Sequence, residues 1–101
     1  MSIQEDIKQR ISDHPVVLFM KGDADAPLCG FSARAVSLLK ECGVPFETVN
    51  VLQDDALRQG IKIFSNWPTI PQLYVKGQFV GGSDIMTEMF ESGELKDLLE
   101  E

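Results

Sequence analysis

The stretch Val-Val-Leu-Phe-Met, residues 16–20, does most to decide the fold of this chain. It is a continuous apolar run of strand length, and it directly follows Pro15. A run of this kind is typical of a β-strand that is buried on both of its faces. We therefore expect residues 16–20 to form an inner strand of a covered sheet.

Helical patterns flank this run on both sides. Upstream, Ser2 and Glu5 have the spacing of a capping box, ahead of an apolar stripe at residues 3, 7 and 11. Downstream, a loop rich in Gly, Asp, Ala and Pro leads to a second apolar stripe, formed by Phe31, Ala35, Leu38 and Leu39. This helix should end near Cys42-Gly43, because Gly43 favours the left-handed C-cap conformation and Pro45 cannot continue a helix.

A second strand is predicted over residues 46–51, where apolar and polar side chains alternate. A helix that separates two strands favours a right-handed parallel βαβ unit. Residues 73–75 and 79–80 form two further strands, and the Lys76-Gly77-Gln78 connection between them is typical of a hairpin.

Three more helices follow from apolar residues at helical spacing. Asp54-Asp55 places negative charge at the start of the first of them, and Ser83 is a candidate N-cap for the second. The apolar positions are Leu57, Ile61 and Phe64, then Ile85, Met86, Met89 and Phe90, and finally Leu95, Leu98 and Leu99.

The predicted order of elements is therefore α-β-α-β-α-β-β-α-α. The most economical packing joins a parallel βαβ half to an antiparallel ββα half, around a four-stranded mixed sheet flanked by helices. This α/β arrangement resembles the thioredoxin-like fold. No linker, low-complexity block or repeat interrupts residues 1–101, so we expect a single domain.

The composition limits the kinds of partner. The 101 residues are 44% hydrophobic and 25% charged, with a formal net charge of −7. Nucleic acids and anionic membranes need a clustered positive surface, so we expect neither as a partner. The acidic N-terminus has no signal-peptide pattern, and no apolar run has the length of a membrane span. With only two cysteines, we expect a reducing, cytoplasmic location.

Cys29 stands where the second predicted helix begins. Free N–H groups and the helix dipole stabilise an anion there, so the pKa of the thiol should fall and favour redox chemistry or metal ligation. The plain alternative is a buried, inert cysteine, but the Gly/Ala/Pro loop before Cys29 favours exposure.

Cys42 and His14 do not complete a site with Cys29. At opposite ends of one helix, the two cysteines would be roughly 20 Å apart, whereas a disulfide needs Cα atoms within about 7 Å. Together with His14 they match no zinc-ligand spacing. We expect Cys42 to pack in the core and His14 to lie in a loop. Ser32 stands where a dithiol motif has its second cysteine, and its hydroxyl can only donate a hydrogen bond to the thiolate.

Four blocks of sequence, in this order and spacing, resemble the monothiol glutaredoxins of the CGFS type over nearly the whole chain. They are Phe19-Met20-Lys21-Gly22, Cys29-Gly30-Phe31-Ser32, Trp67-Pro68-Thr69-Ile70-Pro71-Gln72-Leu73-Tyr74 and Gly81-Gly82-Ser83-Asp84. The long stretch between Lys21 and Cys29 is also similar to this class.

The resemblance implies a groove that binds glutathione. Lys21 and Arg58 would hold the carboxylate of the glycine unit, although Arg58 alone would otherwise be interpreted as a solvated surface charge. Ile70 would pair its backbone with the cysteinyl unit like an added strand, next to a cis bond before Pro71.

The γ-glutamyl end would be bound at the start of the fourth helix. The N–H groups at Ser83 and Asp84 would bind its carboxylate, and Asp84 would accept from its amino group, which is compatible with a plain capping role. Ser83 replaces a cysteine that is frequent in the family. Phe31 and Trp67 would shield the site, although core packing is the more expected of the two roles of Trp67.

The resemblance also implies a [2Fe–2S] cluster. Such a cluster usually needs four thiolates, and two Cys29 side chains with two glutathione molecules would supply them. The implied protein is a cluster-bridged homodimer that passes clusters to recipient iron–sulfur apoproteins and also pairs with BolA-type proteins. The alternative is a glutathione-dependent oxidoreductase that removes glutathione from protein mixed disulfides through Cys29 alone. A purely structural domain would leave Cys29, Lys21 and Asp84 unexplained.

Overall fold

The computed structural model describes residues 2–100, and the order of its elements agrees with the predicted order. The elements are α1 (Ile3–Asp13), β1 (Val16–Met20), α2 (Gly30–Cys42), β2 (Glu47–Asn50), the short 3₁₀ helix η1 (Val51–Gln53), α3 (Asp55–Ser65), β3 (Gln72–Val75), β4 (Gln78–Gly81), α4 (Ser83–Ser92) and α5 (Glu94–Glu100). Within the described residues, no helix combines the length and apolar character needed to cross a membrane.

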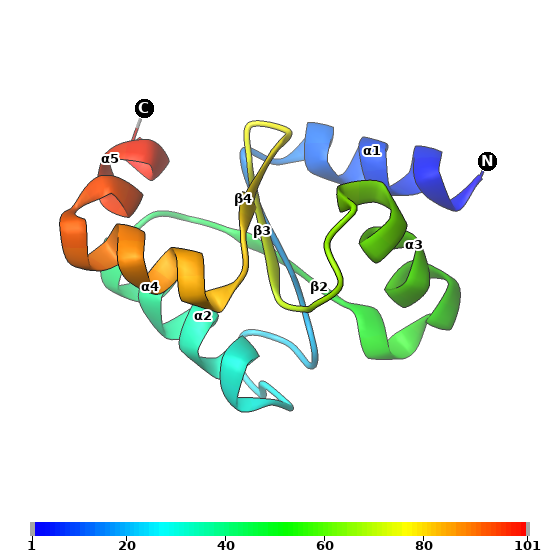
Figure 1. Cartoon of the computed structure of the whole chain (residues 1–101), viewed down its shortest axis with the longest axis horizontal. Helices are drawn as coiled ribbons and strands as arrows, with labels where there is room; N and C mark the ends of the chain where they lie inside the picture. Colours follow the sequence, from blue (N-terminus) through cyan, green and yellow to red (C-terminus); the bar gives the residue numbers. More distant parts are fainter. Residues whose placement is uncertain (1, 101) are drawn as a thin grey trace.

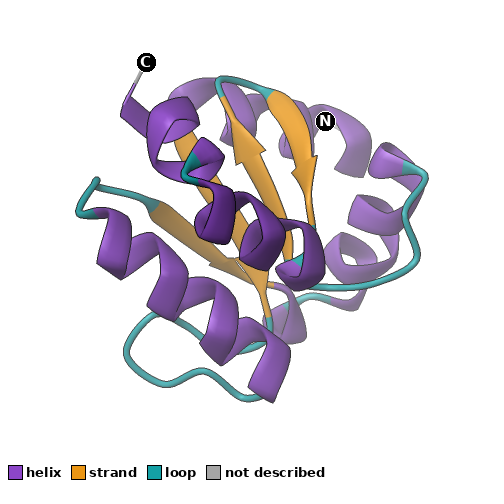
Figure 2. Ribbon diagram, turned by 60° about the vertical axis from the view of Figure 1, so that its left-hand side comes forward, coloured by secondary structure: helices purple, strands orange, loops and turns teal. Residues whose placement is uncertain are grey.

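The four strands form one mixed sheet in the order β2-β1-β3-β4. Strand β1 runs parallel to β2 and antiparallel to β3, and β3 pairs with β4 as a hairpin. The pairing of β1 with β3, in which Leu18 lies opposite Leu73, joins the βαβ half to the ββα half. Helices α1 and α3 cover one face of the sheet, and α2, α4 and α5 cover the other (Figures 1 and 2).

Strand β1 supplies both hydrophobic cores, as its continuous apolar sequence predicts. Val16, Leu18 and Met20 pack into the cluster under α2, α4 and α5, whereas Val17 and Phe19 pack into the cluster under α1 and α3. All five side chains are buried. Because successive residues of a strand point to opposite faces, a central strand between two helical layers has no polar position.

The helix ends follow local chemistry closely. Ser2 caps α1 by accepting a hydrogen bond from the Glu5 N–H, and its hydroxyl donates to the Glu5 carboxylate. Gly43 ends α2 in the left-handed conformation, with φ 74° and ψ 16°. Both predictions are confirmed.

Strand β2 is shorter than predicted. It ends at Asn50, and Val51 begins η1 instead of continuing the strand. The Asn50 side-chain oxygen accepts hydrogen bonds from the N–H groups of Leu52 and Gly22, both at 3.0 Å, and so turns the chain. The hairpin turn is also tighter than predicted, since Lys76 and Gly77 alone form it, at φ 52° and 79°.

The prediction of Ser83 as an N-cap is wrong. Gly82 is the N-cap of α4, in an extended conformation, and Ser83 is the first helical residue, buried at 8% exposure. Position 82 favours a glycine because the backbone at Pro71 approaches it closely. A Cβ atom on Gly82 would lie 3.2 Å from the carbonyl oxygen of Pro71.

Candidate functional site

Cys29 is the N-cap of α2, at the position that its sequence context predicts. Its backbone is extended, with φ −151° and ψ 154°, and its Sγ atom accepts a hydrogen bond from the Ser32 N–H at 3.3 Å. A side chain in this position takes one of the N–H groups that the first turn of a helix leaves without a backbone acceptor. The thiol is partly exposed, and it is not in a disulfide.

The surroundings of Cys29 favour the thiolate. Partial burial raises the pKa of the thiol, but hydrogen bonds from the Ser32 side chain and from the backbone of Ser32 and Phe31 lower it, as does the charge of Lys21. The second set of effects is larger, so the pKa of Cys29 lies below the ordinary value of 9.0. The thiolate is the nucleophilic and metal-binding form, so these surroundings favour the reactive form of the cysteine.

Ser32 connects Cys29 to the end of β1. Its side chain is fully buried, its Oγ atom lies 3.5 Å from Cys29 Sγ, and it accepts a hydrogen bond from the Lys21 N–H at 3.0 Å. Once the thiol is deprotonated, only the hydroxyl can be the donor in the Ser32–Cys29 pair. Ser32 therefore fixes the start of α2 against β1 and stabilises the thiolate with the same hydroxyl.

The loop at residues 21–28 returns the chain to β1 through a close turn. The Leu28 N–H donates to the Lys21 carbonyl at 2.9 Å, and Asp23 Oδ1 accepts from the N–H groups of Asp25 and Ala26. Gly22 adopts φ +88°, and a Cβ atom on it would lie 2.5 Å from the Ala26 carbonyl oxygen. Only glycine suits this position, and the closed loop sets Cys29 beside the end of β1.

A groove of about 350 Å³ opens beside this helix start. Its lining comes from both halves of the fold, namely the end of β1, the first turn of α2, α3, the segment before β3 and the start of α4. The lining residues are Lys21, Phe31, Lys62, Trp67, Pro68, Thr69, Ile70, Pro71, Gly82, Ser83, Asp84 and Ile85. Cys29 is linked to the groove through Phe31 and through Lys21, whose charge acts on the thiol.

The groove has the charges to hold a small zwitterionic ligand with carboxylate groups. Lys21 and Lys62 are cations, Asp84 is an anion, and α4 begins with N–H groups that have no acceptor within the helix. Carboxylates are stabilised by lysines and by a helix N-terminus, whereas an aspartate suits an amino group.

The structure brings most of the predicted site residues together. Lys21, Ile70, Ser83 and Asp84 all line the groove, and the Ile70–Pro71 bond is cis, as the resemblance implies. Arg58 on α3 is not among the lining residues. Its guanidinium is 4.0 Å from the Asp55 carboxylate, and its Nε atom is buried without a hydrogen-bond partner among the described residues.

Sequence reasoning missed Lys62, and of two roles for Trp67 it preferred core packing to shielding of the site. Lys62 lies one helical turn after Arg58, so the i, i+4 spacing on a helix was the signal that could have found it. Trp67 is 41% exposed, lines the groove and packs on Phe79 with ring centroids 6.0 Å apart, so it is not a core residue. A single aromatic residue between Asn66 and Pro68 gives no local pattern that separates these two roles.

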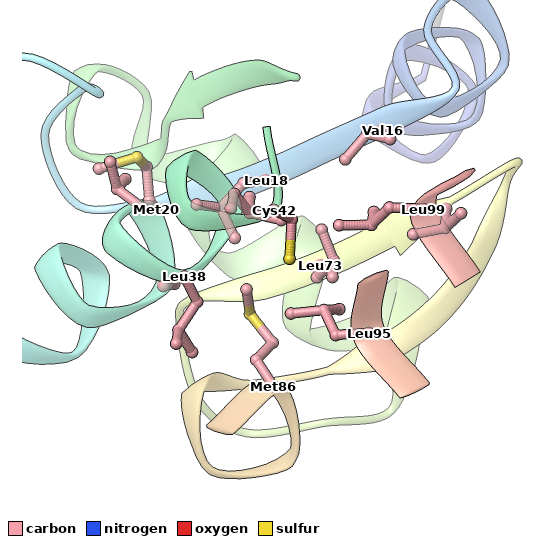
Figure 3. Packing of buried hydrophobic residues seen from close by; sticks show 13 residues of the cluster. Val16, Leu18, Met20, Leu38, Cys42, Leu73, Met86, Leu95 and Leu99 are labelled. Atoms are coloured by element: carbon pink, nitrogen blue, oxygen red, sulfur yellow. The ribbon is translucent and has the colours of Figure 1, made fainter. Parts of the chain in front are cut away.

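Cys42 and His14 lie away from this site. Cys42 is buried in the core, and Figure 3 shows its side chain near Leu18, Leu73 and Met86. Burial raises the pKa of the Cys42 thiol. His14 is exposed and forms the C-cap of α1. Both residues are where the sequence predicts them.

Comparison with known proteins identifies the family. The glutaredoxin family model matches residues 16–80. An uncharacterized monothiol glutaredoxin of Synechocystis is 55% identical over 94 residues, which are 93% of this chain and 88% of that protein. The chloroplastic monothiol glutaredoxin-S14 of Arabidopsis thaliana is 50% identical over 97% of this chain, which spans 57% of that longer relative.

A solved structure agrees with the sequence relatives. The solution structure of reduced poplar apo GrxS14 has a TM-score of 0.85 and 49% identity, covering 97% of this chain and 90% of that one. The chain belongs to the glutaredoxin family and, within the thioredoxin-like superfamily, to the monothiol glutaredoxins.

Proposed function

We propose that this monothiol glutaredoxin binds glutathione and, together with it, carries a [2Fe–2S] cluster to recipient iron–sulfur apoproteins. The observation that carries the proposal is Cys29, an accessible thiol of lowered pKa beside a charged groove, with a serine at the position of a second thiol. A thiolate with no internal partner can act as a cluster ligand without being lost to an internal disulfide.

Glutathione matches the charges of the groove. Lys21 and Lys62 suit the carboxylate of its glycine unit, and we retain Arg58 as a third cation for this end. The N–H groups at Ser83 and Asp84 suit the γ-glutamyl carboxylate, and the Asp84 carboxylate suits the neighbouring amino group. Ile70 would pair its backbone with the central cysteinyl unit.

One chain cannot hold the cluster by itself. Among residues 2–100, no group of three or more His, Cys, Asp and Glu side chains could hold a metal ion. A [2Fe–2S] cluster usually takes four thiolates, so Cys29 would need three further sulfur ligands. A second copy of the chain and two glutathione molecules would supply them. A BolA-type protein would replace the second copy in a mixed complex.

Anaerobic incubation with iron, sulfide and glutathione tests this proposal. We expect a coloured dimer. Its visible charge-transfer spectrum reports the cluster, and size-exclusion chromatography reports the dimer. Cys29→Ser should abolish the colour, and the matched variant Cys42→Ser should keep it, because the Cys42 thiol is buried in the core. A colourless monomer that rapidly reduces a glutathionylated protein would refute the carrier role.

That last outcome would favour a second function, which the lowered pKa of Cys29 also supports. The Cys29 thiolate would attack the glutathione sulfur of a protein mixed disulfide, form its own mixed disulfide and release the protein thiolate. A second glutathione thiolate would then attack this bond, releasing oxidised glutathione and restoring Cys29. We rank this reaction second.

We further propose a cytoplasmic location, because both cysteines are free thiols and the Cys29 chemistry needs a reducing compartment. With a formal net charge of −7, we expect no nucleic acid or membrane partner. Fractionation of the source cells, with detection by antibody, tests the location.

A further inference from the structure

A buried glutamine lies directly behind the groove. The buried polar side chains of the described chain are Ser32, Gln72 and Ser83, and two of them already belong to the site. Ser32 contacts Cys29, and Ser83 lines the groove. Gln72, the first residue of β3, is 0% exposed and is not a lining residue.

The Gln72 amide makes all the hydrogen bonds that its amino group can donate. Nε2 donates to the carbonyl oxygens of Trp67 at 3.2 Å and Thr69 at 3.0 Å, and Oε1 accepts from the Tyr74 hydroxyl at 3.1 Å. The two carbonyls flank Pro68, within the segment at residues 67–71 that forms one wall of the groove. Gln72 thus holds this wall from the side of the core.

Tyr74 fixes the orientation of the amide. Its ring packs against Phe19 and Phe79, with centroids 5.5 Å away in both cases, so its hydroxyl has a defined position. Burial raises the pKa of Tyr74 to about 12, so the phenol keeps the proton that it donates. With Oε1 occupied by this bond, the amino group must face the wall.

The bond to Thr69 has a consequence for Ile70. In a trans peptide the carbonyl of one residue and the N–H of the next point in opposite directions. The cis bond of the described chain follows Ile70, so the Thr69–Ile70 peptide is trans. Because Gln72 draws the Thr69 carbonyl toward the core, the Ile70 N–H points away from the core, on the side where Ile70 lines the groove.

We propose that Gln72 is a positioning residue, which holds the wall at residues 67–71 so that the Ile70 N–H is presented to the backbone of bound glutathione. This inference rests on the proposed glutathione binding. A role in stability alone would not explain why an amide is buried at this position. An apolar side chain of similar volume would fill the same core space without the desolvation cost of an amide.

The substitution Gln72→Met tests the proposal, because it keeps the volume and removes the three hydrogen bonds of the amide. Trp67, the single tryptophan of the chain, lines the groove and reports titrations with reduced glutathione by its fluorescence. We expect roughly tenfold weaker binding, the size of effect that the loss of such bonds produces. In the absence of glutathione, amide hydrogen exchange at Ile70 should be faster in Gln72→Met than in the wild type.

Two further variants separate positioning from stability. Tyr74→Phe keeps the ring and both donors of Gln72 but frees Oε1, so it should weaken binding less than Gln72→Met, and it tests the proposal if Gln72→Met does not fold. Leu99→Ala opens a cavity in the core on the other face of the sheet, so it should lower the melting temperature and leave glutathione affinity unchanged.

The outcomes are distinct when titrations are made well below each melting temperature. If the wild type binds glutathione, and Gln72→Met and Tyr74→Phe bind it with the same affinity, the inference is overturned and the proposed function is left intact. An equal loss of affinity in Leu99→Ala would reduce Gln72 to a stabilising residue and overturn the inference as well. A wild-type protein that does not bind glutathione would refute the proposed function itself.

Discussion

The two ends of helix α2 carry the same residue type in opposite environments. Cys29 at the N-terminus is partly exposed and accepts a hydrogen bond from the helix, whereas Cys42 at the C-terminus is buried among apolar side chains. The pKa of Cys29 is lowered by its donors and by Lys21, and burial raises the pKa of Cys42. The position of a cysteine on a helix and its nearest contacts therefore decide whether its thiol is reactive or only fills space in the core.

The largest expected difference between the two thiols is in alkylation. At neutral pH, iodoacetamide should modify Cys29 at least about a hundredfold faster than Cys42, because thiolate content and access both favour Cys29. Intact-mass spectrometry over time measures the rate, and Cys29→Ser and Cys42→Ser assign the modified residue. Similar rates at both sites in the folded protein would show that the two environments do not separate the cysteines.

Removing one hydrogen bond should reduce the difference between the pKa values of the Cys29 and Cys42 thiols. Ser32→Ala deletes the hydroxyl beside Cys29 but keeps the Ser32 backbone N–H, so the pKa of Cys29 should rise and its thiolate fraction at a given pH should fall. The pH profile of the alkylation rate measures this shift. Ser37→Ala, at an exposed position of the same helix, is the control. If its profile moved equally, the Ser32 hydroxyl would have no special role.

The smallest expected effect is a difference in the pH dependence of stability. The pKa of Cys29 is lowered in the folded state, so its contribution is present above the unfolded value near 9.0 and is lost as pH falls through the folded value. The pKa of Cys42 is raised, so its contribution is full below the unfolded value and is lost as pH rises above it. The two contributions therefore have opposite slopes.

Urea unfolding of Cys29→Ala and Cys42→Ala between pH 7 and 10 would resolve these slopes. Relative to the wild type, Cys29→Ala should lose stability increasingly as pH rises toward 9, whereas the deficit of Cys42→Ala should shrink above 9. Slopes of the same sign in both variants would contradict the assigned environments.

The sequence predicted those parts of the fold that depend on neighbours along the chain. The apolar residues of β1, the capping box at Ser2 and the left-handed Gly43 each have a local cause, and all three are where they were expected. The features that were missed depend on distant partners. Strand β2 stops at Asn50, because the Asn50 side chain also accepts a hydrogen bond from the N–H of Gly22, which lies 28 residues earlier.

The site followed the same rule. The position of Cys29 at a helix start could be predicted, because a helix N-terminus has a local signature. Ser83 was assigned the cap since serine is a stronger capping residue than glycine by side chain alone, but the close approach of Pro71 favours glycine there. Trp67 joins the groove through tertiary packing that no local pattern encodes, and Lys62 has only its i, i+4 spacing from Arg58 as a local signal.

The pairing of β1 with β3 also makes binding in the groove depend on the docking of the two halves of the fold. Cys29 and Lys21 belong to the half that is synthesised first, whereas Ser83 and Asp84 belong to the half that arrives later. A chain that has only the first half lacks the groove residues that the second half supplies. A ligand that bridges both halves would bind only after they dock, and by mass action it would oppose their separation. Occupancy of the groove would thus report that assembly of the domain is complete.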